Sequence, residues 1–330
     1  MERENKNQES LLKKLLPYIQ LLIAIVAVSF SAIIVVYLQN EEHLGISMPS
    51  EVIAMYRTLF AGIGALILSL HRKKIKWLKQ STTLKRSYWL ILAGLFLAIH
   101  FATWFLSLEY VDIAISTTLV DAVPIFLAVF GFIFFKEKLN LFGIIGIIIA
   151  FIGGVLLAFS LPSNGGTQAS SLLGVGFALS GALTVAFYFL IGKKILIDSP
   201  LWPYFAIVNL SSAFFLFIYN LIRGYQLFNY TSLAFLLLIL AALGPSLIGH
   251  ATYNYSLRKL PAFVVGVAIL GEPIGATILG IIFFGQFPQW YAVIYACIIL
   301  VGIVLTSLSQ NIKVKFPKIK KRKELESELV

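Results

Sequence analysis

The chain has 330 residues, of which 59% are hydrophobic and only 12% charged, and its mean hydropathy is +0.91. A soluble domain carries roughly 25% charged residues, so the composition argues against a soluble protein and predicts an integral membrane protein. The formal charge of +11 does not indicate a nucleic-acid partner, because the Lys and Arg residues fall in short segments between apolar runs.

Ten apolar segments are long enough to cross a membrane, since about 20 helical residues span the hydrocarbon core. In chain order, the predicted spans are 17–39, 49–70, 87–108, 112–135, 141–160, 172–192, 201–222, 232–256, 261–284 and 289–309. Several connections are very short, which makes consecutive helices antiparallel neighbours. The predicted fold class is an all-α integral membrane protein with ten transmembrane helices.

The spans fall into two groups of five. We predict an N-terminal tail over 1–16, a first unit over 17–160, a linker over 161–171, a second unit over 172–309 and a basic tail over 310–330. No cleavable signal peptide is evident, because the first apolar run is long enough to remain as an anchor. The single cysteine, Cys297, lies in an apolar span, so no intrachain disulfide is expected.

The distribution of Lys and Arg predicts the orientation. Of 26 basic residues, 24 lie in alternate segments, namely 1–16, 71–86, 136–140, 193–200, 257–260 and 310–330. The other five loops contain only Arg223, and Arg57 lies inside a span. Because cytoplasmic loops carry the excess of basic residues, both termini are predicted to be cytoplasmic, with the cell (inner) membrane as the location.

The two groups of spans repeat each other at a constant offset of 149 residues. Ser107-Leu108, Pro124-Ile125 and Gly153 recur as Ser256-Leu257, Pro273-Ile274 and Gly302, and further matches fall at the same offset. A duplicated unit with an odd number of spans must insert the second time upside down. Inverted-topology repeats are typical of secondary transporters, which hold substrate at the repeat interface near the bilayer midplane.

Three charged residues lie within the spans, where charge is costly and usually faces a cavity or a partner. A rise of 1.5 Å per residue places Arg57, Asp121 and Glu272 all about 12–13 Å below the outer edge of the hydrocarbon core. A shared polar cavity explains this common depth. Arg57 is then expected to hold a carboxylate or a substrate anion, and the less well paired acid becomes a candidate proton site. The alternative is a static Arg57–Asp121 ion pair that locks two spans together.

Histidine and tryptophan side chains accompany these charges. His100 lies near the same level, and Trp104 is one turn further out on the same helix face. Both could contact substrate, although Trp104 could equally be an interfacial aromatic residue. His250 and Asn254 lie one turn apart nearer the cytoplasmic end, as an inner gate or as helix–helix hydrogen-bond partners.

Glycines and prolines are placed as in helices that move. Gly143-x-x-Gly146, Gly153-Gly154, Gly62-x-Gly64 and the run from Gly271 to Gly280 are expected to permit close helix approach. Pro124 and Pro273 occupy repeat-equivalent positions, and each frees a backbone carbonyl one turn earlier. Paired interruptions in corresponding spans point to a transporter site, and simple packing kinks are the alternative.

Each half of the chain carries a set of short motifs. The first half carries the run His100-Phe-Ala-Thr-Trp-Phe-x-Ser-Leu, followed by Ala114-x-Ser-Thr and Pro124. The second half carries Gly249-His250, Tyr253-Asn254 and Leu270-Gly271-Glu272-Pro273. In these motifs the chain resembles the drug/metabolite transporter superfamily, EamA-type, over nearly its whole length. The resemblance implies ten helices in two repeats and the movement of small metabolites, often outward.

One position departs from the family's pattern. Glu137, in the turn Phe135-Lys136-Glu137-Lys138, has Gln286 as its repeat partner, where the family usually places a second glutamate. If that pair of carboxylates served coupling, half of it is absent here. We therefore interpret Glu137 as structural or as an inner-end contact.

These features together predict a secondary active transporter that moves a small metabolite by alternating access. An amino acid or related compound is the expected substrate class, with efflux as the direction and protons as the coupling ion. Arg57, Asp121, Glu272, His100 and Trp104 are the predicted substrate site. No metal site, cofactor or nucleotide-binding loop is expected, and the oligomeric state is left open. A channel-like protein or an intramembrane enzyme using Asp121 and Glu272 is the alternative.

Overall fold

The computed structural model describes residues 2–72, 74, 77, 86–135, 141–160, 168–196, 199–256 and 268–309. Within these residues the regular structure is helical, and no strand occurs among them. The first half contains α1 (Glu2–Gln39), α2 (Glu41–Leu44), α3 (Ser50–His71), α5 (Ser87–Ser107), α6 (Ile113–Val120), α7 (Val123–Phe135) and α8 (Leu141–Ser160). The second contains α9 (Gln168–Leu196), α10 (Leu201–Arg223), α11 (Ser232–Ala241), the π-helix η2 (Ala242–His250), α12 (Ala251–Ser256), α14 (Gly271–Phe284) and α15 (Trp290–Ser309).

The chain is an all-helical membrane protein, as predicted. Six stretches are long and apolar enough to span a bilayer: Ile19–Gln39, Ser50–His71, Ser87–Ser107, Ser171–Leu196, Leu201–Arg223 and Ser232–Ser256. Four shorter apolar helices lie in the remaining predicted segments. Large apolar side chains are exposed over the outside of the molecule, for example Phe151 and Ile222 at 71% and 79%. Exposed apolar surface on this scale is suited to lipid.

Three of the predicted spans are interrupted. The segment 112–135 is divided into α6 and α7 by a turn at Asp121-Ala122, and a turn at Leu270 precedes α14. Pro124 and Pro273 each clash with the backbone carbonyl four residues earlier. Each turn begins at the residue that follows this carbonyl. With an offset of 149 residues, Asp121 and Leu270 are repeat equivalents, so the two halves break at the same place.

The third interruption is η2, which separates α11 from α12. Pro245 lies inside it and has no N–H to donate to Ala241 O. The hydroxyl of Ser246 donates to that carbonyl instead, at 3.4 Å. The wider turn also aims Ser246 at α3, where it accepts a hydrogen bond from Arg57.

Two predicted boundaries differ from the helices. The first helix begins at Glu2 rather than at 17, because the tail contains mostly Glu, Lys, Gln and Leu, which favour helix. Helix α9 begins at Gln168, inside the predicted linker, because a helix need not end where its apolar run does. The tail over 310–330 lies outside the described residues.

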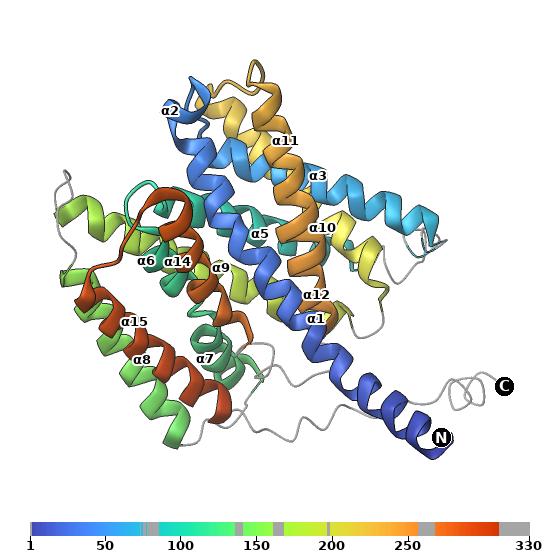
Figure 1. Cartoon of the computed structure of the whole chain (residues 1–330). Helices are drawn as coiled ribbons and strands as arrows, with labels where there is room; N and C mark the ends of the chain where they lie inside the picture. The colour runs from blue at the N-terminus through green and yellow to red at the C-terminus, as the bar shows by residue number, and fades with distance from the viewer. Residues whose placement is uncertain are drawn as a thin grey trace.

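The helices pair across the two halves in a regular way. Helix α3 packs against α10 and α8 against α15, so each of these four helices pairs with its repeat counterpart. Helix α6 packs against α14, and these two helices lie in the corresponding spans 112–135 and 261–284. The contacts of α5 with α9 are matched by those of α1 with η2. Figure 1 shows α8 and α15 side by side on the opposite side of the molecule from α3 and α11.

Glycines allow the closest of these approaches. An added Cβ at Gly302 would lie 2.5 Å from Ala150 N and 2.6 Å from Gly146 O, so α8 and α15 touch backbone to backbone. Gly153 also faces α15, as predicted. Gly154 does not, since nothing lies within 4 Å of its added Cβ. It points away because one residue turns the helix by about 100°.

Candidate functional site

A small buried cavity lies where the interrupted helices meet. Its lining includes both carboxylates that the sequence singled out, Asp121 at the break after α6 and Glu272 in the first turn of α14. The full lining is His100, Trp104, Val120, Asp121, Val123, Val185, Phe189, His250, Tyr253, Ile269 and Glu272. The cavity volume is about 20 Å³. That is room for about one water molecule, so the cavity does not have room for a metabolite as it stands.

The cavity lining follows the internal repeat. Trp104 and Tyr253 are 149 residues apart, and so are Val120 and Ile269. Val123 and Glu272 form a third such pair, with the acid in one half only. The cavity therefore lies between the two repeats, and both contribute corresponding positions to it.

Polar atoms around the cavity lack partners. His100 Nε2, Trp104 Nε1, Asp121 Oδ2 and both ring nitrogens of His250 are buried without a hydrogen bond. Buried polar groups in proteins are paired in the large majority of cases, because an unpaired one costs about 1–3 kcal/mol. Several such atoms on one cavity indicate a site arranged for a polar ligand.

The neighbouring helix fixes the orientation of His100. Its Nδ1 lies 2.9 Å from Gly181 O on α9. A carbonyl oxygen can only accept, so Nδ1 carries the proton and Nε2 of the neutral ring is left as an acceptor toward the cavity. Gly181 permits this contact, since an added Cβ would lie 3.1 Å from Val120 and 3.4 Å from Trp104 Cβ. The His100 and Trp104 rings stack with centroids 5.8 Å apart.

The two acids face each other across the cavity. Asp121 and Glu272 are each 7% exposed and interact electrostatically. The Tyr253 side chain lies beside Glu272. Two carboxylates in so small a space repel each other when both are charged, so a cation or a proton shared between them is favoured.

Arg57 is completely buried but does not line the cavity. Its Nε donates to Ser246 Oγ at 2.9 Å, and Nη1 donates to Ser31 Oγ at 2.5 Å. The guanidinium carbon lies 4.3 Å from the centre of the Phe101 ring, which suits a cation–π contact. Nη2 has no partner. The alternative of a static Arg57–Asp121 pair is not observed, since no ion pair joins these two described residues.

The predicted gate residues separate from each other. His250 lines the cavity beside Tyr253, whereas Asn254 lies outside it and donates to Tyr188 Oη on α9 at 2.8 Å. Asn254 thus makes a helix–helix hydrogen bond, one of the two roles expected for it. The π-turn before His250 brings that side chain to the level of His100, and both histidines contact Phe101.

Glu137 lies outside the described residues, but its repeat partner is informative. Gln286 Oε1 accepts a hydrogen bond from Ile113 N, at 3.3 Å, and so caps the first turn of α6. Helix N-termini leave backbone N–H groups that need such acceptors. Among the described residues, no group of three His, Cys, Asp or Glu side chains is placed to hold a metal ion.

Comparison with known protein families assigns the chain. The model of the EamA-like transporter family matches twice, over residues 18–159 and 172–308. The chain belongs to this family. The two matches coincide closely with the predicted units 17–160 and 172–309, and the family is one of membrane transporters.

Individual relatives agree with the family assignment. The EamA-like protein is 26% identical over 254 residues to an uncharacterised transporter of Bacillus subtilis strain 168, YxxF, covering 76% of this chain and 77% of that one. It is 25% identical over 255 residues to an uncharacterised transporter of Clostridium kluyveri, covering 76% and 81%. A protein of known crystal structure shares the fold, with a TM-score of 0.62 at 17% identity, covering 88% of this chain and 96% of the other.

Sequence reasoning missed Tyr253 in the cavity lining and Phe101 beside it. A signal for Tyr253 was present, since it stands 149 residues after Trp104. Phe101, by contrast, is one of 27 phenylalanines, and only the structure places it between Arg57 and His250.

Proposed function

We propose that this EamA-family transporter is a secondary active exporter of a small zwitterionic metabolite, an amino acid or a close relative. The observation that carries the proposal is the small cavity between the repeats, whose lining includes two acids near paired helix breaks and several unpartnered polar atoms. Discontinuous helices at a repeat interface are the usual setting of a transporter's substrate site.

The proposed topology has ten transmembrane helices in two inverted repeats, with both termini in the cytoplasm. The pairing of α3 with α10 and of α8 with α15, each with its repeat counterpart, supports it, because an axis in the membrane plane relates such repeats. The 24-to-1 distribution of basic residues in the loops supports the orientation.

The charges suit a zwitterion. The ammonium group is placed between Asp121 and Glu272, and His100 Nε2 is available as a further acceptor. Arg57 carries a buried charge that interacts electrostatically with Glu272 but makes no contact ion pair with it, and its guanidinium lies against the Phe101 ring. We propose that a shift of the Phe101 and Trp104 rings opens the guanidinium to the substrate carboxylate. A cavity of about 20 Å³ must expand for this, as alternating access requires.

Protons are the proposed coupling ion. When the cavity holds no substrate cation, repulsion between Asp121 and Glu272 favours one shared proton. An incoming ammonium group releases that proton, so substrate and proton exclude each other from one site. Such competition makes the protein an exchanger that uses the inward proton gradient for export.

The test is transport by the purified protein in proteoliposomes, first with a mixture of labelled amino acids. We expect Asp121→Asn to reduce flux of the identified substrate at least tenfold with normal folding. Asp112→Asn is the matched control, because Asp112 begins α6 outside the cavity and its side chain makes no capping hydrogen bond. Equal flux in the two variants would remove Asp121 from the substrate site.

Coupling is tested separately with an imposed pH gradient. Flux in the wild type is expected to rise when the substrate-free side is acidic, and Glu272→Gln is expected to abolish the response while exchange of labelled for unlabelled substrate continues. If wild-type flux ignores the gradient, proton exchange is excluded and the binding site itself is unaffected.

A further inference from the structure

A second, larger hollow lies on the outside of the helix bundle, between α5 and α9. Its volume is about 560 Å³, within the range of sites that hold small organic ligands. Most of the lining is aromatic or aliphatic, and two cations complete it: Arg86, Tyr88, Trp89, Leu92, Phe96, Phe187, Leu190, Ile191, Lys194 and Ile195. We call this hollow the α5–α9 groove. It shares no residue with the buried cavity.

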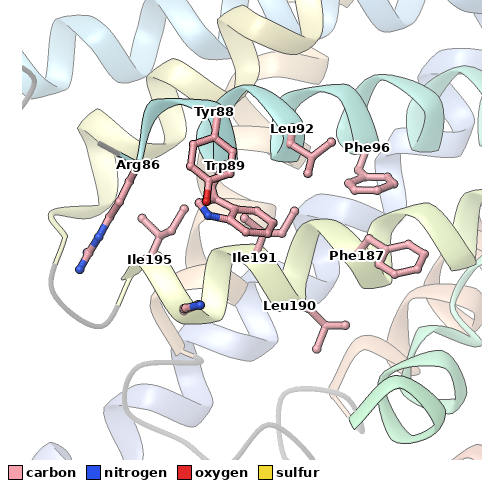
Figure 2. Close-up of a pocket in the computed structure, with 10 residues that line it drawn as sticks. Arg86, Tyr88, Trp89, Leu92, Phe96, Phe187, Leu190, Ile191 and Ile195 are labelled. Carbon is pink, nitrogen blue, oxygen red and sulfur yellow. The ribbon is translucent and has the colours of Figure 1, made fainter. Parts of the chain in front are cut away.

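The groove has a charged end and an apolar end. Figure 2 shows Arg86 at one end of the lining and Phe96 with Phe187 at the other. The Lys194 ammonium lies 5.9 Å from the centre of the Trp89 ring, so the second cation is also at the Arg86 end. The rings of Phe96 and Phe187 stack 5.0 Å apart, and Phe187 stacks on Phe130 of α7 at 4.6 Å. This stack closes the apolar end.

The length of the groove matches half a bilayer. From Arg86 to Phe96 the axis of α5 rises about 15 Å, and one leaflet provides half of a hydrocarbon core of about 30 Å. Tyr88 and Trp89 are 58% and 37% exposed at the charged end. Exposed aromatic rings beside cations mark the level of the lipid headgroups, and the apolar lining extends from there toward the midplane.

We propose that the α5–α9 groove is a binding site for one anionic phospholipid, whose phosphate contacts Arg86 and Lys194 and whose acyl chain lies along the groove to the Phe96–Phe187 stack. The cations give selectivity for the anionic headgroup, and the aliphatic residues Leu92, Leu190 and Ile191 contact the chain. In the proposed orientation the lipid belongs to the cytoplasmic leaflet.

A lipid bound in this groove is expected to affect the geometry of the substrate site. Helices α5 and α9 are also joined by the hydrogen bond from His100 to Gly181, one turn beyond Phe96. A lipid that holds the two helices together therefore stabilises the contact that orients His100.

The test is lipid selectivity at Trp89, measured by quenching of its fluorescence with brominated acyl chains. The full-length protein is reconstituted in phosphatidylcholine with increasing phosphatidylglycerol, and either lipid carries the bromine. Subtracting the signal of Trp89→Phe isolates the contribution of the groove. Each cation near anionic lipid contributes about fivefold in affinity. We therefore expect the wild type to prefer phosphatidylglycerol over phosphatidylcholine by roughly 25-fold. Arg86→Gln should retain a preference of roughly fivefold, and the double variant Arg86→Gln with Lys194→Gln should show almost no preference.

Arg223→Gln is the matched control, because Arg223 is an exposed cation at the far end of another helix, α10. Its selectivity should equal the wild-type value. Equal quenching by both brominated lipids in the wild type would overturn the proposal, and so would a loss in Arg223→Gln as large as in Arg86→Gln.

A second measurement tests whether the acyl chain lies in the apolar part of the α5–α9 groove. Leu92→Phe with Leu190→Phe fills the groove without changing charge, and native mass spectrometry counts the phosphatidylglycerol that stays bound. Ile218→Phe with Ile222→Phe places the same bulk on the lipid-exposed face of α10 as a control. We expect loss of bound lipid only in the first variant, and retention there would refute the seating of the chain. Neither measurement involves transport, so both stand apart from the proposed export.

Discussion

Replacement of Gly302 by alanine tests the close pairing of α8 with α15. The added Cβ would lie 2.5 Å from Ala150 N, 2.6 Å from Gly146 O and 2.8 Å from Ala150 Cβ, whereas ordinary contacts are 3.4–4 Å. All three are backbone or Cβ atoms that cannot rotate away, so the two helices must separate by about 1 Å. A gap of 0.5–1 Å already loses a quarter to a half of each dispersion contact.

The expected cost of this separation is about 1–3 kcal/mol, the usual range for overpacking. Van der Waals packing is a main force between helices in lipid, and α15 is the principal neighbour of α8. Gly154→Ala is the matched control on α8, because its added Cβ meets nothing within 4 Å. Alanine also favours helix over glycine by about 1 kcal/mol, so this control should be neutral or slightly stabilised.

The assay is thermal unfolding of the purified protein in one detergent at one scan rate, since unfolding of a membrane protein is governed by rate as well as by equilibrium. At about 2–4 °C per kcal/mol, Gly302→Ala should unfold several degrees below Gly154→Ala. Equal midpoints for the two variants would refute the reasoning and show that α8 and α15 pack less closely than described.

Three further predictions address the site and its surroundings. Trp104→Phe keeps an aromatic ring beside His100 and removes the unpartnered Nε1–H. Because that group is proposed to bind substrate, flux in proteoliposomes should fall about tenfold. Unchanged flux would show that Trp104 serves packing alone. Ser246→Ala removes the hydrogen-bond acceptor of buried Arg57 Nε and should destabilise the folded protein by about 1.5–3 kcal/mol. Ser212→Ala is the control and should be neutral, because the buried Ser212 hydroxyl has no partner. The thermal unfolding midpoints of the two variants measure the difference. The pKa of Glu109, in the loop after α5, is raised, mainly because the carboxyl group is partly desolvated. A hydrogen bond from Ser50 lowers this pKa, and the nearby charge of Glu51 raises it further. A raised carboxyl pKa favours the folded state at low pH and loses that contribution as pH rises through the folded value. Glu109→Gln should therefore gain stability relative to wild type at pH 7 but not at pH 4, by less than about 1 kcal/mol for so exposed a group; an equal difference at both pH values would contradict this sign.

The amino-acid sequence by itself determined the apolar segments that form helices and two of the three places at which they break. Apolar length predicts the spans, because lipid requires every backbone group to be paired within a helix. Pro124 and Pro273 predict breaks at equivalent places, because proline removes a donor at a fixed distance along the chain. The acids Asp121 and Glu272 stand out for the same reason, since charge in lipid needs a partner.

Only the tertiary structure decided what these residues contact. Equal depth suggested that Arg57 lines one cavity with the acids. The packing of α3 against α1 and η2 instead gives its guanidinium Ser31 and Ser246 as hydrogen-bond partners, and α5 places Phe101 against it. His250 lies at the end of η2 and lines the cavity, whereas its depth estimated for a regular helix placed it nearer the cytoplasmic end. Periodicity along one helix fixes depth and face, whereas the neighbours of a side chain depend on how separate helices pack together.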